Sequence, residues 1–265
     1  SSCPSSSTRT PDSDPAGVFI IAHGFKGYKD YGMFPILGRT FAEAGYLVHR
    51  FNFSHSGMTN ETETFARPDL FEQDTWNKQV TDLRAVVDAM QQGEIEGDEL
   101  PYILFGHSRG GVSVILTAGR YVRDDTFLQP AGIATAAAPA TCNPFTNEQV
   151  VQLQKDGRIE SPSNRTGQTL YVGRAFLQEV LDDPDNHDVK RMLSRVPCPV
   201  LLMHGDGDPT VTPEDSSMLT SPLSPSSRLV VAAVRSATSV SSALAAAMAP
   251  TSRAAENRTA LAKTS

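Results

Sequence analysis

The sequence predicts an α/β protein with a mostly parallel sheet flanked by helices, and three observations support this prediction. Short, continuously apolar runs recur along the chain, as expected for strands that are buried on both faces of a parallel sheet. Segments with apolar residues at helical spacing lie between these runs. The 265 residues are 39% hydrophobic and 20% charged, which is typical of one globular domain with a sizeable core.

Five apolar runs are predicted to form the strands of this sheet. They are residues 18–22, 46–51, 102–105, 132–138 and 199–203. Helical patterns alternate with them, at residues 34–44, 76–93, 112–122 and from residue 212 onward. Gly45 and Gly93 stand where the first two of these helices end, and glycine is the usual residue just after a helix. Strands that alternate with helices in this way predict a sheet with helical crossovers.

The alternation stops in residues 141–198, where only helical patterns are evident. Thr146 and Gln149 have the spacing of a capping box, and Gly157 follows as a helix end. Two further helices are expected at residues 175–181 and 188–193. We therefore expect a helical cap insertion here, which divides the core into residues 16–140 and 199–219.

The two ends of the chain differ from this core. Residues 1–15 consist mainly of Ser, Thr, Pro and Asp, which predicts a disordered lead-in. Residues 220–265 form an atypical tail rich in Ser and Ala, expected to be poorly ordered, with weak patterns for a last strand at 228–234 and a helix at 242–248. From residue 216 the chain has five basic residues, one acidic residue and no Gly, His or aromatic residue.

Composition excludes several classes of function. No run approaches the roughly 18 apolar residues of a membrane span, and a formal net charge of −7 argues against a nucleic-acid partner. The three cysteines lack CxxC spacing, so neither a disulfide framework nor a metal site is expected. No glycine-rich phosphate or dinucleotide motif is present, so no cofactor is expected. A cytoplasmic location is the default, although the chain does not begin with Met, which leaves a removed targeting segment open.

Residues 106–110 read Gly-His-Ser-Arg-Gly, which fits the pattern G-x-S-x-G. The motif follows a predicted strand and precedes a predicted helix, which is where a nucleophilic serine on a sharp turn belongs. Gly106 and Gly110 allow the close approach of neighbouring strands, and His107 stands before the serine. Ser108 is therefore the candidate nucleophile. The alternative is a serine in an ordinary strand-to-helix turn.

Two further groups of residues fit the same chemistry. His23 and Gly24 end the first predicted strand, so the backbone N–H groups of Phe25 and Arg109 are candidate oxyanion donors. Asp208 follows the strand that ends near residue 203 and is the candidate triad acid, with Asp206 as the second choice. For these residues the alternatives are a turn with a structural histidine and a turn or capping aspartate.

Together these segments resemble the α/β-hydrolase superfamily, and they are most similar to its serine aminopeptidase-like and dienelactone-hydrolase-like branches. The resemblance covers roughly residues 18–219 and rests on the His-Gly-Phe-Lys-Gly turn at 23–27, the run at 50–54, the elbow at 106–111 and His-Gly-Asp-Gly-Asp at 204–208. It implies an eight-stranded, mostly parallel sheet and a Ser-acid-His triad that hydrolyses acyl bonds without a cofactor. By this resemblance Ser108 is the nucleophile and Asp208 is the acid.

The sequence departs from this pattern at both ends. The family's first two strands have no predicted counterpart before Val18, and the final strand and helix are missing or aberrant. The triad order places the base last, yet no histidine follows His204. Two explanations compete: a reading-frame or splice-model error that replaced the native C-terminus, which we favour, and a pseudoenzyme.

The sequence therefore predicts a serine hydrolase, either an esterase or a serine aminopeptidase-like enzyme, whose partner is a small acyl substrate. Loss of the triad histidine from such an enzyme costs about 10⁶ in kcat, so the chain as written is expected to be close to inactive. The alternative is a non-catalytic protein that binds a small acyl ligand on the same fold. Nothing in one sequence separates hydrolysis from acyl transfer.

Overall fold

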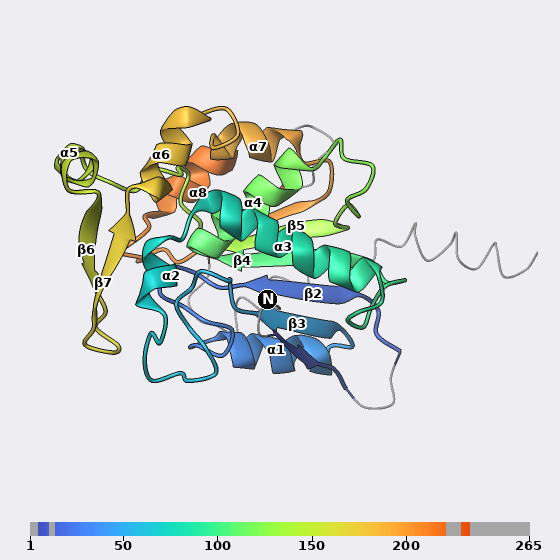
Figure 1. The fold of residues 1–265 in the computed structure, drawn as a ribbon. Helices are drawn as coiled ribbons and strands as arrows, with labels where there is room; N and C mark the ends of the chain where they lie inside the picture. Colours follow the sequence, from blue (N-terminus) through green and yellow to red (C-terminus); the bar gives the residue numbers. More distant parts are fainter. Residues whose placement is uncertain (1–4, 11–13, 221–228, 234–265) are drawn as a thin grey trace, which may run out of the picture.

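The computed structural model describes residues 5–10, 14–220 and 229–233, which form a mostly parallel sheet flanked by helices (Figure 1). The seven strands lie in the order β1-β3-β2-β4-β5-β8-β9. They are β1 Ser5–Thr8, β2 Val18–Ala22, β3 Leu47–Phe51, β4 Tyr102–His107, β5 Gly132–Ala136, β8 Val200–His204 and β9 Leu229–Ala233. Only β1 is antiparallel to its neighbour, β3. The predicted fold class is confirmed.

Helices cover both faces of this sheet. The helix α1 (Phe34–Glu43) lies on one face, and α3 (Trp76–Gln91), α4 (Arg109–Arg120) and α7 (Val189–Arg195) lie on the other (Figure 1). The remaining helices described are α2 (Pro68–Glu72), α5 (Asn147–Asp156), α6 (Ala175–Asp182) and α8 (Pro213–Thr220). Three layers result, as the alternation of strands and helices predicted.

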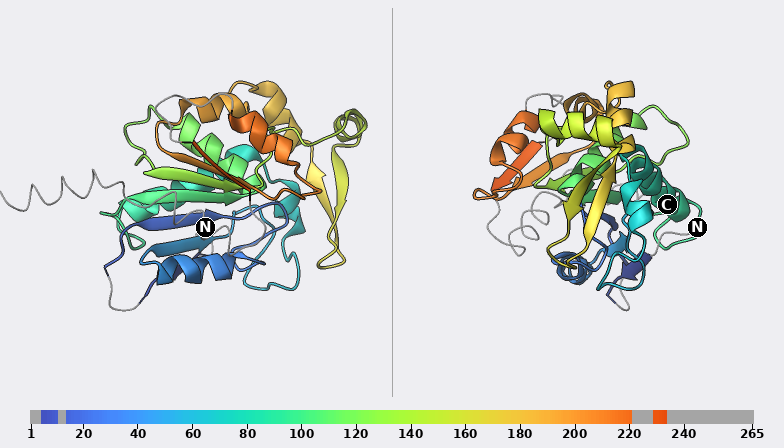
Figure 2. Two further views of the ribbon diagram at one scale, coloured as in Figure 1. Left: turned by 180° about the vertical axis from the view of Figure 1, so that it is seen from behind. Right: turned by 60° about the vertical axis from the view of Figure 1, so that its left-hand side comes forward.

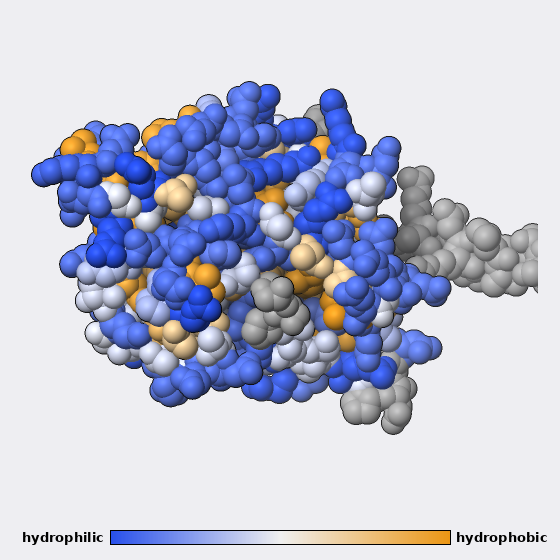
Figure 3. Space-filling view, viewed as in Figure 1, coloured by the Kyte–Doolittle hydropathy of each residue, from blue (hydrophilic) through white to orange (hydrophobic). Residues whose placement is uncertain are grey.

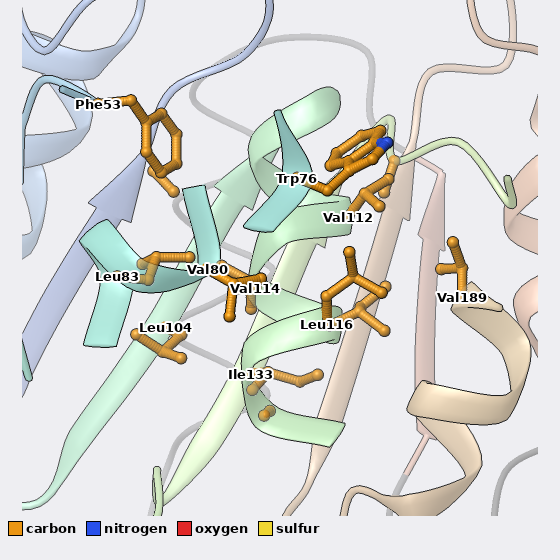
Figure 4. Close-up of a cluster of buried hydrophobic side chains, with 14 of the residues drawn as sticks. Phe53, Trp76, Val80, Leu83, Leu104, Val112, Val114, Leu116, Ile133 and Val189 are labelled. Atoms are coloured by element: carbon orange, nitrogen blue, oxygen red, sulfur yellow. The ribbon is translucent and has the colours of Figure 1, made fainter. Parts of the chain in front are cut away.

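The residues of β2 show how this sheet is buried on both faces. Val18 and Ile20 belong to the larger hydrophobic cluster, which includes side chains of α3 and α4. Phe19 and Ile21 belong to a second cluster with Phe34, Leu37 and Phe41 of α1. Successive side chains point to opposite faces of a strand, so a continuously apolar run is required here. Figure 4 shows part of the larger cluster, with Val80 and Leu83 of α3 near Val114 and Leu116 of α4.

The predicted capping box stabilises the start of α5. The Thr146 side chain accepts a hydrogen bond from the backbone N–H of Gln149, whose side chain in turn accepts from the backbone N–H of Thr146. Gly157 ends this helix with a φ of 78°, a left-handed conformation that suits glycine. Both expectations for this helix are confirmed.

The cap prediction is wrong in one respect, because the segment is not purely helical. The strands β6 (Arg158–Pro162) and β7 (Thr169–Gly173) pair as an antiparallel hairpin beside α5. Three of the five residues of β6 are exposed, so no apolar run marked this strand, whereas β7 has only one exposed residue and its short Leu-Tyr-Val run lies between helical patterns. The hairpin stands at one side of the main sheet (Figure 1) and comes forward in the right-hand view of Figure 2.

Both predicted departures at the chain ends also need correction. Residues 5–8, within the predicted disordered lead-in, form the edge strand β1, whose polar sequence gave no strand signal because both of its faces stay partly exposed. A strand thus does precede Val18. Near the other end, β9 pairs in parallel with β8, with Leu229 opposite Val200, so a last strand is present. The predicted helix at 242–248 and the rest of the tail lie outside the described residues.

The described surface is mainly hydrophilic. In the view of Figure 3, hydrophobic residues form small separate patches among hydrophilic ones. None of the helices in the described ranges has both the length and the apolar character of a membrane span.

Candidate active site

Ser108 lies on a sharp turn between β4 and α4. Its φ of 53° and ψ of −122° are strained for a residue with a side chain. The turn is possible because glycines flank it: a Cβ on Gly106 would lie 2.2 Å from the Gly110 carbonyl oxygen, and a Cβ on Gly110 would lie 2.5 Å from the Ala22 carbonyl oxygen. The G-x-S-x-G motif therefore occupies the strand-turn-helix geometry that the sequence predicted.

The loop after β2 packs directly against this turn. A Cβ on Gly24 would lie 3.1 Å from the Ser108 Cβ and 3.1 Å from the His107 carbonyl oxygen, so only glycine allows this approach without displacement. The next residue is Phe25, whose backbone N–H has no hydrogen-bond partner among the described residues, and the same is true of the Arg109 N–H at the start of α4. Two free amides beside Ser108 suit an oxyanion hole.

His23 fixes the conformation of this loop. Its Nδ1 donates to the Gly24 carbonyl oxygen at 2.9 Å, and its Nε2 accepts from the Phe53 backbone N–H at 3.2 Å. Burial lowers the pKa of His23 to about 4, and the charge of Arg109 contributes to the same shift. The imidazole is therefore neutral near pH 7, with both nitrogens engaged, and it acts as a structural link between the loops after β2 and β3.

Asp208 and Asp206 lie in the loop between β8 and α8. The Asp208 Oδ1 accepts hydrogen bonds from the backbone N–H groups of Thr210 (2.9 Å) and Val211 (3.1 Å), and the residue is half-buried, whereas Asp206 is exposed. Burial lowers the pKa of His107, and the negative charge of Asp208 opposes this shift. Asp208 is therefore electrostatically coupled to the residue that precedes Ser108, which favours it over Asp206.

His204, at the end of β8, holds this loop in place through two hydrogen bonds. Its Nδ1 accepts from the Ser216 hydroxyl at 2.7 Å, and its Nε2 donates to the Val211 carbonyl oxygen at 2.7 Å. The loop that carries Asp208 is thereby tied both to the end of β8 and to α8.

Within the described part of the chain, no histidine side chain is hydrogen-bonded to the Ser108 hydroxyl. His49 contacts Ser7 and Glu96. His55 contacts Ser54, and His187 donates to the Asp183 carbonyl oxygen. Five of the six histidines thus have other hydrogen-bond partners, and among the described residues no histidine is hydrogen-bonded to Ser108 as a general base.

A cavity of about 570 Å³ opens beside Ser108. Its walls include three aromatic side chains, Phe25, Trp76 and Phe145, and two apolar side chains from the hairpin, Ile159 and Val172. A second cavity of about 300 Å³ is lined by His107, Phe34 and Tyr31 among others, and Ser108 also belongs to its lining. Ser108 thus lines two cavities, and the larger one has aromatic and apolar walls together with the charged residues Arg109, Glu160 and Asp215.

The β6–β7 hairpin, which forms one wall of the larger cavity, is bound at its tip to other parts of the protein. Gln168 accepts from the Phe65 backbone N–H at 2.8 Å and donates to the Phe65 carbonyl oxygen at 3.2 Å. The Arg165 guanidinium packs over the rings of Tyr28 and Phe65, at 5.1 and 5.0 Å from their centroids. Lys26 donates to the Pro162 carbonyl oxygen at 2.6 Å. No local pattern in the sequence predicts this wall, because its contacts join residues far apart in the chain.

Comparison with known proteins identifies the family. A family model described as serine aminopeptidase, S33 matches residues 13–155, more than half of the chain. The chain belongs to this family. The matched part of this serine aminopeptidase family protein includes the His23 loop and the Ser108 turn but ends before the hairpin and the Asp208 loop.

One curated relative of this family member is a lipase. A monoacylglycerol lipase from Mycolicibacterium smegmatis is 30% identical over 128 residues, which are 48% of this chain and 41% of the lipase. The chain thus spans less than half of that relative's length. Two solved structures share the fold at 18% identity: Est1E from Butyrivibrio proteoclasticus with bound ferulic acid (TM-score 0.65, 91% of this chain, 92% of that one), and a putative hydrolase from Agrobacterium vitis (0.69, 93% and 98%). The fold is that of the α/β-hydrolases.

Proposed function

We propose that this protein is a serine hydrolase of acyl bonds in which Ser108 is the nucleophile. The observation that carries the proposal is the strained backbone of Ser108, at φ 53°, next to two free amides. Strained conformations persist where the surrounding structure enforces them, and they cluster at active sites. An ordinary strand-to-helix turn needs no such strain, and although the first N–H groups of any helix are free, the free amide of Phe25 belongs to a separate loop.

In the proposed reaction the Ser108 Oγ attacks the acyl carbonyl carbon, and the carbonyl oxygen becomes an oxyanion. The N–H groups of Phe25 and Arg109 donate hydrogen bonds to it, assisted by the N-terminal end of α4. The proton of the Ser108 hydroxyl passes to the leaving group as the alcohol or amine departs, which leaves an acyl-serine. Water then hydrolyses this ester to release the carboxylic acid, and the Ser108 oxygen regains a proton. Asp208 would orient an imidazole base and stabilise it when protonated.

The aromatic and apolar walls of the 570 Å³ cavity support an uncharged acyl group of moderate size as substrate. Ester hydrolysis is favoured over peptide hydrolysis because the relatives include lipases and an esterase. The chain as written is expected to be impaired, since no histidine follows His204 in the sequence and an unassisted serine hydroxyl is a poor nucleophile.

A fluorophosphonate probe tests the proposal, because it reacts covalently with an activated serine. Intact-mass spectrometry after incubation should show one slow adduct on the full chain and none on Ser108→Ala. Equal labelling of the two proteins would refute Ser108 as the nucleophile. Translation of the coding DNA after the Leu219 codon in the other two frames tests the explanation for the impairment: a strand-like run followed by Gly and His would restore the triad.

A second candidate is a non-catalytic protein that binds a small acyl ligand in the same cavity. It is favoured by one observation, the lack of any histidine bonded to Ser108 in the described ranges. This candidate predicts thermal stabilisation by p-nitrophenyl esters that Ser108→Ala leaves unchanged, with no release of p-nitrophenol. Probe labelling confined to Ser108 would contradict it.

A further inference from the structure

A closed ring of buried polar side chains links α3 to the first turns of α4. Arg109 Nη1 donates to Asp74 Oδ2 at 3.0 Å, and Gln79 Nε2 donates to the same oxygen at 2.6 Å. The Ser113 hydroxyl lies 2.6 Å from Gln79 Oε1 and 3.2 Å from the Arg109 carbonyl oxygen, which closes the ring. All four residues are buried. Such a network holds its members in one arrangement.

The Arg109 side chain extends this ring to the candidate oxyanion hole. Its guanidinium carbon lies 4.0 Å from the centroid of the Phe25 ring and 4.3 Å from that of Phe176 on α6. Arg109 and Phe25 are also the residues whose backbone N–H groups face the site. The position of one guanidinium is therefore coupled to both amide donors.

Asp74 is the only carboxylate that neutralises this guanidinium through an ion pair in the described structure. Its Oδ1 is buried and has no hydrogen-bond partner among the residues described, and it faces a cavity of about 10 Å³ that Phe25 and Arg109 also line. An ion pair of this kind costs desolvation, so loss of one partner leaves an uncompensated buried charge. Because the buried Asp74–Arg109 ion pair costs desolvation free energy, we expect Asp74 to have a role besides packing.

We propose that Asp74 is a positioning residue of the oxyanion hole, which acts through the Arg109 guanidinium to hold Phe25 and the first turn of α4 in place. The proposal rests on the proposed function, because it assigns the Phe25 and Arg109 amides to the oxyanion. Asp74 itself touches no reacting atom.

The first test is the rate at which a fluorophosphonate probe modifies Ser108 in the full chain at pH 8, followed by intact mass. Asp74→Asn keeps the size of the side chain but leaves the guanidinium unpaired, and we expect it to slow labelling roughly 10-fold, since loss of a whole oxyanion donor costs about 10² to 10³. The matched control is Asp82→Asn, which removes another buried carboxylate of α3 that receives the Ser54 N–H. It should label within about 2-fold of the parent chain, because at pH 8 Asp74, with a pKa of about 6, is ionised with or without the Asp82 charge.

The second test removes both charges. In the double variant Asp74→Leu with Arg109→Met both backbone amides remain, but the guanidinium through which Asp74 acts is gone. The double variant should therefore label no more slowly than Arg109→Met alone, because two losses are not additive when one residue acts through the other. A role of Asp74 that is independent of Arg109 would give additive losses. Labelling of Asp74→Asn at the parent rate, or a double variant slowed by the product of the two single effects, would overturn the proposal.

The pH profile provides a readout that does not need Asp74→Asn to fold. Burial raises the pKa of Asp74 to about 6 against the opposing charge of Arg109, and the charge of Asp82 in α3 adds to the increase. His23 and Lys26, from the loop after β2, face Arg109, and the pKa values of both are lowered. The labelling rate of the parent chain divided by that of the double variant should therefore fall as the pH drops through about 6. A constant ratio would contradict the proposal.

The controls separate this proposal from the proposed function. If the parent chain and Ser108→Ala take up the probe equally, the proposed function fails, whatever Asp74 does. If labelling is confined to Ser108 and is indifferent to Asp74, only the positioning role fails.

Discussion

Around Ser108 backbone packs against backbone, whereas around Asp208 the chain is a surface loop held by local hydrogen bonds. A Cβ on Gly106 or Gly110 would collide with main-chain atoms at 2.2 to 2.5 Å, but a Cβ on Gly207, next to Asp208, would meet nothing within 4 Å. The turn that carries Ser108 is thus fixed by main-chain packing. The loop that carries Asp208 is held by local hydrogen bonds, and a base for the proposed triad would have to come from another segment.

The strongest test of this contrast is a pair of glycine substitutions. Gly106→Ala forces a methyl group into the Gly110 carbonyl, and it should lower the free energy of unfolding by at least about 4 kcal/mol, among the largest single-residue effects. Gly207→Ala should change it by less than about 0.5 kcal/mol. Urea unfolding followed by circular dichroism measures both. Similar losses in the two variants would contradict the contrast.

His23 should make the free energy of unfolding sensitive to acid through the loop that packs against Ser108. Its pKa is about 4 in the folded protein, against 6.5 for an unperturbed imidazole, so its contribution to stability is complete above about pH 6.5 and is lost as the pH falls toward 4. The shift corresponds to roughly 3 kcal/mol. Urea midpoints at pH 7 and 4.5 should therefore differ less in His23→Gln than in the parent chain, and an unchanged difference would rule out His23 as the cause.

A smaller effect is expected from the strain at Ser108 itself. Ser108→Gly removes the Cβ that disfavours a φ of 53°, so it should raise the free energy of unfolding by about 1 kcal/mol. Ser108→Ala retains the Cβ and serves as the matched control, with little change. Thermal unfolding of both variants measures this, and a stabilised alanine variant would show that strain is not the cause.

The smallest effect is expected at Asp208. In Asp208→Asn the side-chain oxygen still accepts from the Thr210 and Val211 amides, so the free energy of unfolding should change by less than about 0.5 kcal/mol. A loss above about 1 kcal/mol, measured by urea unfolding, would show that the charge of this carboxylate stabilises the fold.

The same contrast explains what could be predicted from the sequence. The elements around Ser108 have strong local signals: buried strands read as apolar runs, and the turn needs glycines at fixed positions. The edge strand Ser5–Thr8 and the hairpin strand Arg158–Pro162 are largely polar, so no apolar run marked them. Thr169–Gly173 is mostly buried and includes Leu170 and Val172, but it is short and lies between helical patterns, which dominated the prediction.

Contacts between residues far apart in the chain also could not be predicted from the sequence. Asp74 precedes a helix N-cap, Thr75, and reads as an ordinary turn residue, yet it pairs with Arg109 in the fold. Residues 35 positions apart carry no local pattern that would link them. By contrast, Phe25 and Arg109 were predicted as oxyanion donors from motifs alone, because each amide belongs to a short motif next to Ser108. Their role in catalysis stays a prediction.

The way the hairpin is fastened has a consequence for how substrate preference can change. Gln168 and Lys26 bind main-chain atoms, so these contacts do not depend on which side chains their partner residues carry. Ile159 and Val172, which face the cavity, lie between the fastened tip and the base of the hairpin. Evolution can therefore reshape the acyl cavity by exchanging a few hairpin side chains, while the sheet, the Ser108 turn and the oxyanion loop stay as they are.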